Sequence, residues 1–130
     1  MKSLFITSTL HSDWNVIFNP KLCTILESKG IQCHLPQRDT EQNGSRKEVF
    51  QQNINGIKNS EQILCVASNE SVNWGGEVGF AFGIKKRIIA LKKNHEIPLM
   101  LKYMADEIFE TDDINNINEY IDELIKKIKK

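Results

Sequence analysis

The stretch ILCVASNESVNWGGEVGFAFGIKKRIIAL, residues 63–91, decides how the chain folds. It opens with a short apolar run typical of a buried parallel strand, continues through a polar loop, and ends in a second apolar run at residues 88–91. Between the loop and the second run lies a helical pattern that carries Glu77. The stretch therefore predicts one strand, helix, strand unit with a carboxylate in the first turn of its helix.

Glu77 is the best candidate for a functional residue. Asn73 is expected to cap the helix, so that Trp74, Gly75 and Gly76 occupy the first helical positions directly before the glutamate. Two glycines lower helix propensity, and we expect that a ligand approaches the backbone closely there. The free N–H groups and the positive end of the helix dipole are expected to keep Glu77 ionised and to favour an anion beside it.

The helix around Glu77 is expected to be buried, because its sequence is apolar nearly all round. Its apolar side chains are Val78, Phe80, Ala81, Phe82 and Ile84. The first turn of such a helix would open into a crevice. The alternative is that Glu77 only complements the helix dipole at the surface.

Strands alternate with helices along the whole chain. The expected strands are residues 4–6, 31–35, 63–67, 88–91 and 108–109. The expected helices follow residues 10–13, begin at Ser45 and near Trp74 and Pro98, and start last at Asp112 or Asp113, while residues 37–45 are expected to be a polar loop. This alternation predicts an α/β fold, a flavodoxin-like three-layer sandwich with a five-stranded parallel sheet in the order 2-1-3-4-5, as one domain over residues 1–130.

The order of the strands predicts where a ligand binds. In such a sheet the crevice lies beyond the carboxyl ends of strands 1 and 3, where the strand order reverses. Residues 7–10, which include Thr7 and Ser8, are expected to face residues 68–77 there. Residues 36–39, at the end of strand 2, are expected to stand beside them.

The composition excludes several classes of partner. Lysine plus arginine and aspartate plus glutamate each number 17, so the formal net charge is zero and nothing points to nucleic acid or an anionic membrane. The three cysteines, Cys23, Cys33 and Cys65, are expected to be reduced core thiols of a cytoplasmic protein rather than disulfides or metal ligands. No run is apolar for long enough to predict a signal peptide or a membrane span, and neither a metal nor a cofactor is expected.

Four segments in this order and spacing resemble the nucleoside 2-deoxyribosyltransferase family, including its branch of deoxynucleoside 5'-monophosphate N-hydrolases. They are the first strand with its small polar residues, Leu-Pro-Gln-Arg-Asp at 35–39, Phe-Gln-Gln-Asn-Ile-Asn-Gly-Ile at 50–57, and Gly-Glu-Val-Gly-Phe-Ala-Phe-Gly at 76–83. The resemblance covers roughly residues 4–91. It implies a nucleoside or nucleotide substrate and assembly into homodimers or larger homo-oligomers, with parts of the pocket donated across the interface.

The resemblance also implies a mechanism in which Glu77 is the nucleophile. The carboxylate attacks C1' of the sugar and expels the base, through an oxocarbenium-like transition state and a glycosyl-enzyme. Water then hydrolyses the glycosyl-enzyme, or a second base accepts the sugar.

Ser71 stands six residues before Glu77, where transferases of this family usually carry an aspartate. The monophosphate hydrolases resemble the chain better here, because a serine at this place helps to hold their 5'-phosphate. Ser71, Asn73 and the amides of Gly75 and Gly76 could do the same in this chain. The alternative is that Ser71 is simply a loop serine.

Asn53 stands where the family has an aspartate that serves the sugar or proton transfer to the base. An amide can form hydrogen bonds but cannot act as a general acid. Three alternatives follow: catalysis is slow, catalysis uses another proton donor, or catalysis is absent. The candidate donors are His11, Asp13 and Asp39. A lone histidine in a loop, such as His11, is more often solvated and without a catalytic role.

Two further residues have two interpretations each. Trp74 could stack on a base or anchor the start of the helix in the core, and the second is favoured. Arg38 could pair with a phosphate in bidentate geometry or be solvated like most loop arginines.

Two other functions stay open. Residues 7–8, 38–39 and 74–77 also resemble Toll/interleukin-1 receptor (TIR) domains, in which a Trp-x-x-Glu helix supplies the glutamate of the members that cleave NAD. Glu77 would then keep its role and the substrate would change. The second is a non-catalytic nucleotide-binding or interaction module, and Asn53 is its best support.

Overall fold

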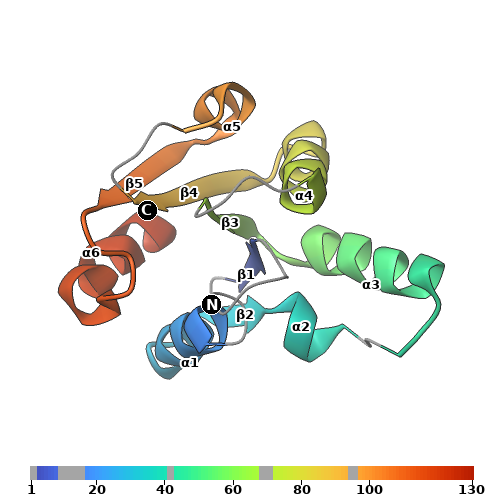
Figure 1. Cartoon of the computed structure of the whole chain (residues 1–130), viewed down its shortest axis with the longest axis horizontal. Helices are drawn as coiled ribbons and strands as arrows, with labels where there is room; N and C mark the ends of the chain where they lie inside the picture. The colour runs from blue at the N-terminus through green and yellow to red at the C-terminus, as the bar shows by residue number, and fades with distance from the viewer. Residues whose placement is uncertain (1–2, 9–16, 41–42, 68–71, 94–96) are drawn as a thin grey trace.

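The computed structural model describes residues 3–8, 17–40, 43–67, 72–93 and 97–130. Within these residues, five parallel strands form one sheet in the order β2-β1-β3-β4-β5 (Figure 1). The strands are β1 (Ser3–Thr7), β2 (Gln32–His34), β3 (Gln62–Val66), β4 (Arg87–Lys93) and β5 (Glu107–Thr111). The predicted α/β fold and strand order 2-1-3-4-5 are therefore confirmed.

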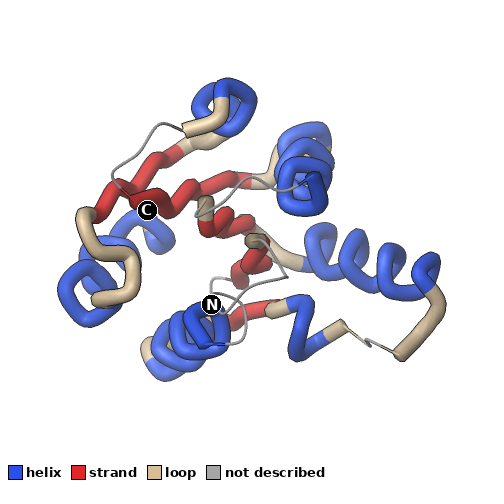
Figure 2. Tube along the Cα trace, viewed as in Figure 1, coloured by secondary structure: helices blue, strands red, loops and turns tan. Residues whose placement is uncertain are grey.

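Helices cover both faces of the sheet. They are α1 (Asn19–Ser28), α2 (Pro36–Asp39), α3 (Arg46–Asn59), α4 (Val72–Gly83), α5 (Leu99–Met104) and α6 (Ile117–Lys129). Figures 1 and 2 show α1 and α6 on one face and α3, α4 and α5 on the other, with the short α2 beside the edge strand β2. None of the helices in the described part of the chain is long and apolar enough to cross a membrane.

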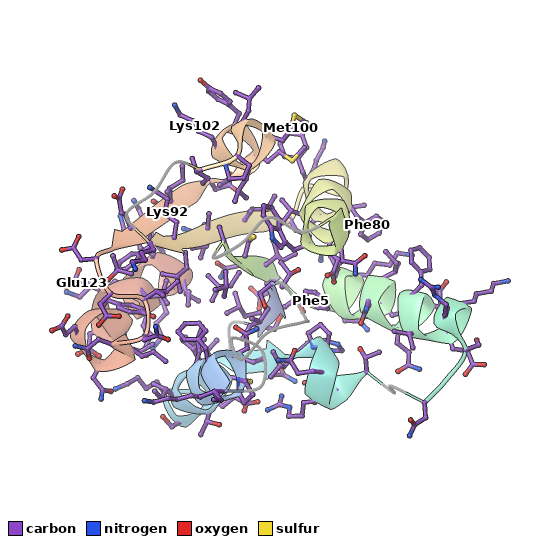
Figure 3. The ribbon with its side chains drawn as sticks, in the orientation of Figure 1. Phe5, Phe80, Lys92, Met100, Lys102 and Glu123 are labelled. Atoms are coloured by element: carbon purple, nitrogen blue, oxygen red, sulfur yellow. The ribbon has the colours of Figure 1, made fainter. Side chains whose placement is uncertain are left out.

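Each face of the sheet has its own apolar cluster, because successive strand residues point to opposite faces. Leu64 and Val66 of β3 pack with α1 and α6, whereas Ile63 and Cys65 pack with α3, α4 and α5. Phe5 of β1 belongs to the second cluster, and Figure 3 shows it in the interior of the molecule. β3 is buried on both faces, as its continuous apolar sequence predicts.

Local sequence signals account for several helix ends. The Ser45 side chain accepts a hydrogen bond from the Glu48 backbone N–H at 3.2 Å, so the predicted cap begins α3. The chain leaves α1 through Gly30, whose φ of 85° lies in the left-handed region that glycine adopts without strain.

Two predicted boundaries are wrong. Residues 37–39, predicted as part of the loop, belong to α2 (Pro36–Asp39), because Pro36 starts the turn and the Asp39 carboxylate accepts the Leu35 N–H at 2.8 Å. The last helix begins at Ile117 rather than directly after Asp112 or Asp113, since Asp113 accepts from the Asn115 N–H at 3.2 Å and forms a turn instead.

The helix around Glu77 is not buried all round as predicted. Only one face of α4 packs on the sheet, through Trp74, Val78 and Ala81, which recur at steps of four and three residues. Phe82 of α4 and Ile84 directly after the helix remain 51% and 38% exposed. An apolar sequence therefore does not guarantee burial here, because the described part of the chain has nothing to cover the outer face of α4.

Candidate functional site

The structure brings Thr7 and Glu77 together, although they lie 70 residues apart in the sequence. Thr7 is the last residue of β1 and is buried, and its Oγ1 donates a hydrogen bond to Glu77 Oε1 at 3.0 Å. β1 and β3 are neighbours in the sheet, and the strand order reverses between them. The pair therefore lies at the carboxyl end of the sheet, at the position where open parallel sheets bind ligands.

The two oxygens of the Glu77 carboxylate differ. Oε1 accepts from Thr7, whereas Oε2 is buried and has no hydrogen-bond partner among the described residues. A buried carboxylate oxygen without a donor is costly, and each such group in a native protein calls for an explanation, such as a catalytic role or a bound water. Oε2 is therefore the oxygen of this carboxylate that no described group holds.

Glu77 is not held in the ionised form as predicted. Burial raises its pKa to about 7, and the hydrogen bond from Thr7 only partly opposes this shift. The reason lies in the start of α4, which begins at Val72 and places Glu77 as the sixth helical residue. The free N–H groups belong to the first turn, so they do not reach the Glu77 carboxylate.

Cys65 lies on β3 beside this carboxylate. Burial raises the pKa of its thiol, and the charge of Glu77 raises it further. Cys65 is therefore a neutral thiol in the wall of the site rather than a nucleophile.

The start of α4 differs from the prediction in one residue and agrees with it in another. Asn73 is not the cap but the second residue of the helix, and it is exposed. Trp74 is only 5% exposed and packs in the apolar cluster with Phe5, which supports its role as a core anchor. A Cβ atom built on Gly75 or Gly76 would meet no heavy atom within 4 Å. The contacts of the described chain therefore do not require glycine at these two positions.

The other predicted residues after β1 and β3 are only partly described. Ser8 is buried, and its hydroxyl accepts a hydrogen bond from the Asn19 side-chain amide of α1. His11, Asp13 and Ser71 lie outside the described residues.

Asn53 belongs to a chain of polar contacts that reaches β2. The Thr40 hydroxyl donates to Asn53 Oδ1 at 2.7 Å, and His34 Nε2 lies 3.4 Å from the same hydroxyl oxygen. The His34 ring stacks on Phe5, with centroids 5.0 Å apart and an angle of 15° between the planes. Burial lowers the pKa of His34, so the imidazole is neutral at neutral pH.

Arg38 and Asp39 make their described contacts with the edge strand and with α1. Arg38 Nη2 donates to the Cys33 carbonyl at 3.0 Å, and Nη1 donates to Glu27 at 2.8 Å. Asp39 accepts from Arg38 and from the Leu35 N–H. These side chains therefore cover backbone groups that an edge strand would otherwise expose to another strand. Their binding of substrate stays a prediction.

A polar groove of about 600 Å³ runs along this edge of the sheet, between β2 and α3. Its lining includes Glu27, His34, Arg38, Asn55 and Asn59, and Glu77 is not among the lining residues. The groove is therefore a feature of the β2 edge and not the crevice predicted above Glu77. Within the described ranges, no group of three or more His, Cys, Asp and Glu side chains is arranged to hold a metal ion.

Sequence reasoning missed His34 and Thr40. His34 was expected only as a strand residue and Thr40 only as part of a polar loop. Their spacing from each other and from Asn53 matches no motif, because the contacts join β2, the end of α2 and α3. No signal in a single sequence identifies such a set.

Comparison with known proteins identifies the family. A sequence model described as nucleoside 2-deoxyribosyltransferase matches residues 4–126. This match extends well past the segment around residue 91 where the resemblance in the sequence fades. No curated protein matches the sequence.

Solved structures share the fold at low sequence identity. A 2-deoxyribosyltransferase from Bacillus psychrosaccharolyticus has a TM-score of 0.73 at 17% identity, covering 91% of each chain. A CMP N-glycosidase from Clostridium botulinum has a TM-score of 0.73 at 17% identity, covering 96% of this chain and 99% of its own. The TIR domain of a Toll-related receptor from Hydra magnipapillata has a TM-score of 0.70 at 20% identity, covering 98% of each chain.

The structural likenesses establish only the fold, whereas the sequence match spans nearly the whole chain. The chain belongs to the nucleoside 2-deoxyribosyltransferase family.

Proposed function

We propose that this protein cleaves the N-glycosidic bond of a nucleoside or its 5'-monophosphate, with Glu77 as the nucleophile. The observation that carries the proposal is the state of the Glu77 carboxylate. One of its oxygens is held by Thr7, and the other is buried without a partner among the described residues. Membership of a family of deoxyribosyl-transferring enzymes supports the same chemistry.

The proposed reaction has two steps. Glu77 Oε2 attacks C1' of the sugar, the bond from C1' to the base nitrogen breaks, and the base leaves with the electron pair and takes a proton from water. Water then attacks C1' of the glycosyl ester, which frees the carboxylate and one proton. A second base in place of water would make the protein a transferase.

The surroundings of the Glu77 carboxylate suit a nucleophilic attack. The Thr7 hydroxyl stabilises and orients the carboxylate, while burial leaves Oε2 poorly solvated and therefore reactive once it is ionised. Only the ionised form can attack C1', and the pKa of Glu77 is about 7. The rate of base release should therefore rise with pH across neutrality and level off above it.

A 5'-phosphate is proposed to lie at the start of α4. Gly75 and Gly76 are exposed, and the space where their side chains would be is open. Asn73 is exposed beside them, and the first turn offers free N–H groups. A phosphate could approach the backbone here closely, with Ser71 as a further ligand.

The experiment is a search for free base by chromatography after incubation with deoxynucleoside monophosphates, deoxynucleosides and NAD. Release from the first two substrates that is lost in Glu77→Ala would support the proposal, and retention of release in Ser71→Ala would favour a nucleoside over a monophosphate. Release from NAD alone would favour the TIR-like reaction, which the shared fold keeps as the alternative. Nucleotide binding without release from any substrate would favour a non-catalytic module and contradict the proposal.

We also propose that the chain acts as a homodimer or larger homo-oligomer. Two large aromatic side chains, Phe50 of α3 and Phe82 of α4, are 61% and 51% exposed on the helices that flank the site. Because α3 and α4 are in contact, these side chains are exposed on neighbouring helices, and a grouped apolar patch would support such an interface.

A further inference from the structure

Asn53 lies at the same end of the sheet as Glu77. Gly56, one turn later in α3, packs directly on β1 and β2, since a Cβ atom there would lie 3.0 Å from the Phe5 ring and 2.9 Å from His34 Nε2. Thr7 lies two residues beyond Phe5 toward the carboxyl end of β1. α3 runs back along the neighbouring strand β3, so its earlier residues lie toward that end too. α3 also contacts α4, which carries Glu77.

The chain of contacts has a defined direction. A threonine hydroxyl has one proton, and Thr40 gives it to Asn53 Oδ1 at 2.7 Å. Toward His34 Nε2, 3.4 Å away, the same oxygen can therefore act only as an acceptor. The neutral imidazole must then carry its proton on Nε2, and the hydrogen bonds run from His34 through Thr40 to Asn53.

This direction determines what Asn53 offers to a ligand. Its carbonyl oxygen is occupied by the Thr40 proton, and its amide nitrogen keeps two N–H donors that no described group accepts. The residue is half-buried, so these donors lie at the surface of the helix where a ligand can reach them. A turn of the amide by 180° would reverse the chain, because the Asn53 N–H group would then donate to the Thr40 hydroxyl and Thr40 would donate to His34, so the tautomer of His34 distinguishes the two arrangements.

We propose that Asn53 is a hydrogen-bond donor to an acceptor atom of the substrate, and that Thr40 and His34 are positioning residues that hold its amide in this orientation. The inference rests on the proposed function, because it takes the substrate to lie between Asn53 and Glu77. The acceptor is a carbonyl oxygen or an unprotonated ring nitrogen of the leaving base. An amide N–H there stabilises the negative charge that the base gains as the glycosidic bond breaks, without transferring a proton.

The first test needs neither ligand nor variant. Nitrogen-15 NMR of the intact protein at neutral pH reports which imidazole nitrogen of His34 is protonated. The expected result is a proton on Nε2, and a proton on Nδ1 would overturn the proposal, because Thr40 would then donate to His34 and Asn53 would present its carbonyl instead.

The second test measures affinity in a Glu77→Gln background, which does not consume its ligand. The probes are deoxycytidine 5'-monophosphate and deoxyadenosine 5'-monophosphate, and calorimetry measures the dissociation constant of each. Thr40→Val should weaken binding of the better probe about three- to tenfold, the value of one neutral hydrogen bond, and Thr40→Ser should restore it. Thr24→Val is the matched control, because the Thr24 hydroxyl donates to the Pro20 carbonyl within α1 and is exposed.

The outcomes separate this inference from the proposed function. Thr40→Val with unchanged affinity and a lower melting temperature would show a merely structural role and overturn the inference, as would the absence of binding by both probes. Binding that follows the expected pattern, together with no base release from the unmodified protein, would uphold the inference and overturn the proposed glycosidase.

Discussion

At the scale of the residue, the protonation of Glu77 couples the site to the stability of the fold. The carboxyl group has a pKa of about 7 in the folded protein and an ordinary value of 4.5. The folded state therefore holds a proton that the unfolded chain has already lost between these two values. Stability from this group is present below the ordinary pKa and is lost as the pH rises through 7.

Replacement of the ionisable group should remove this dependence. Glu77→Gln keeps the shape of the side chain and cannot ionise, so the free energy of unfolding at about pH 8 should rise by roughly 2–3 kcal/mol relative to the unmodified protein, with little change at about pH 5. Urea unfolding at the two pH values measures the difference. The control is Glu123→Gln, because the Glu123 carboxylate is exposed and pairs with the exposed Lys126. An equal effect of Glu77→Gln at both pH values would contradict the raised pKa.

At the scale of the element, α3 approaches the sheet closely at a single glycine. Gly56 is buried and faces the stacked rings of Phe5 and His34. The helix can carry the polar contact of Asn53 to Thr40 because its backbone is this near to β1 and β2. Gly79 of α4 does not serve such a close approach, because a side chain there would point into open space.

These two glycines should respond to alanine with opposite signs. Gly56→Ala places a methyl group against two rings, and overpacking should outweigh the gain in helix propensity, for a net loss of about 1–2 kcal/mol in the free energy of unfolding. Gly79→Ala, the matched change in open space, should stabilise by about 0.5–1 kcal/mol. Chemical denaturation of both variants measures the two changes in the free energy of unfolding. Stabilisation by Gly56→Ala would mean that α3 does not lie this close to β1 and β2.

At the scale of the whole molecule, the two faces of the sheet differ in what covers them. The helices α3, α4 and α5 share one face (Figure 1) and carry most of the large apolar side chains that are exposed in the described part of the chain. These are Phe50, Phe82, Leu99, Met100 and Tyr103. Figure 3 shows Met100 and Lys102 on the outside of α5, away from the sheet. This face is therefore the proposed surface for self-association.

A charge on this face should change the oligomeric state. Phe82→Asp combined with Phe50→Asp should shift the protein toward the monomer in sedimentation velocity, because an aspartate in an apolar interface loses its hydration. Ile17→Asp is the control, since Ile17 is 66% exposed and precedes α1 on the other face. A monomeric unmodified protein, or an equal shift in the control, would refute self-association through α3 and α4.

The sequence by itself determined the architecture. The apolar runs of β3 and β4, the glycine after α1 and the serine before α3 are local signals, and right-handed crossovers leave few ways to connect them. Glu77 could be singled out as a candidate from the sequence as well, because it is a charged residue in an apolar helix that follows a buried strand. The strand order placed it at the carboxyl end of the sheet, beside Thr7.

Only the tertiary structure decided the chemistry of these residues. The raised pKa of Glu77 follows from burial, and the direction of the Asn53 amide follows from Thr40 and His34, which come from other elements. The contacts of Arg38 and Asp39 with the β2 edge likewise depend on which backbone groups the sheet leaves unpaired. Periodicity reports which face of an element is apolar, whereas desolvation and hydrogen-bond direction arise from atoms that are neighbours only after the chain has folded.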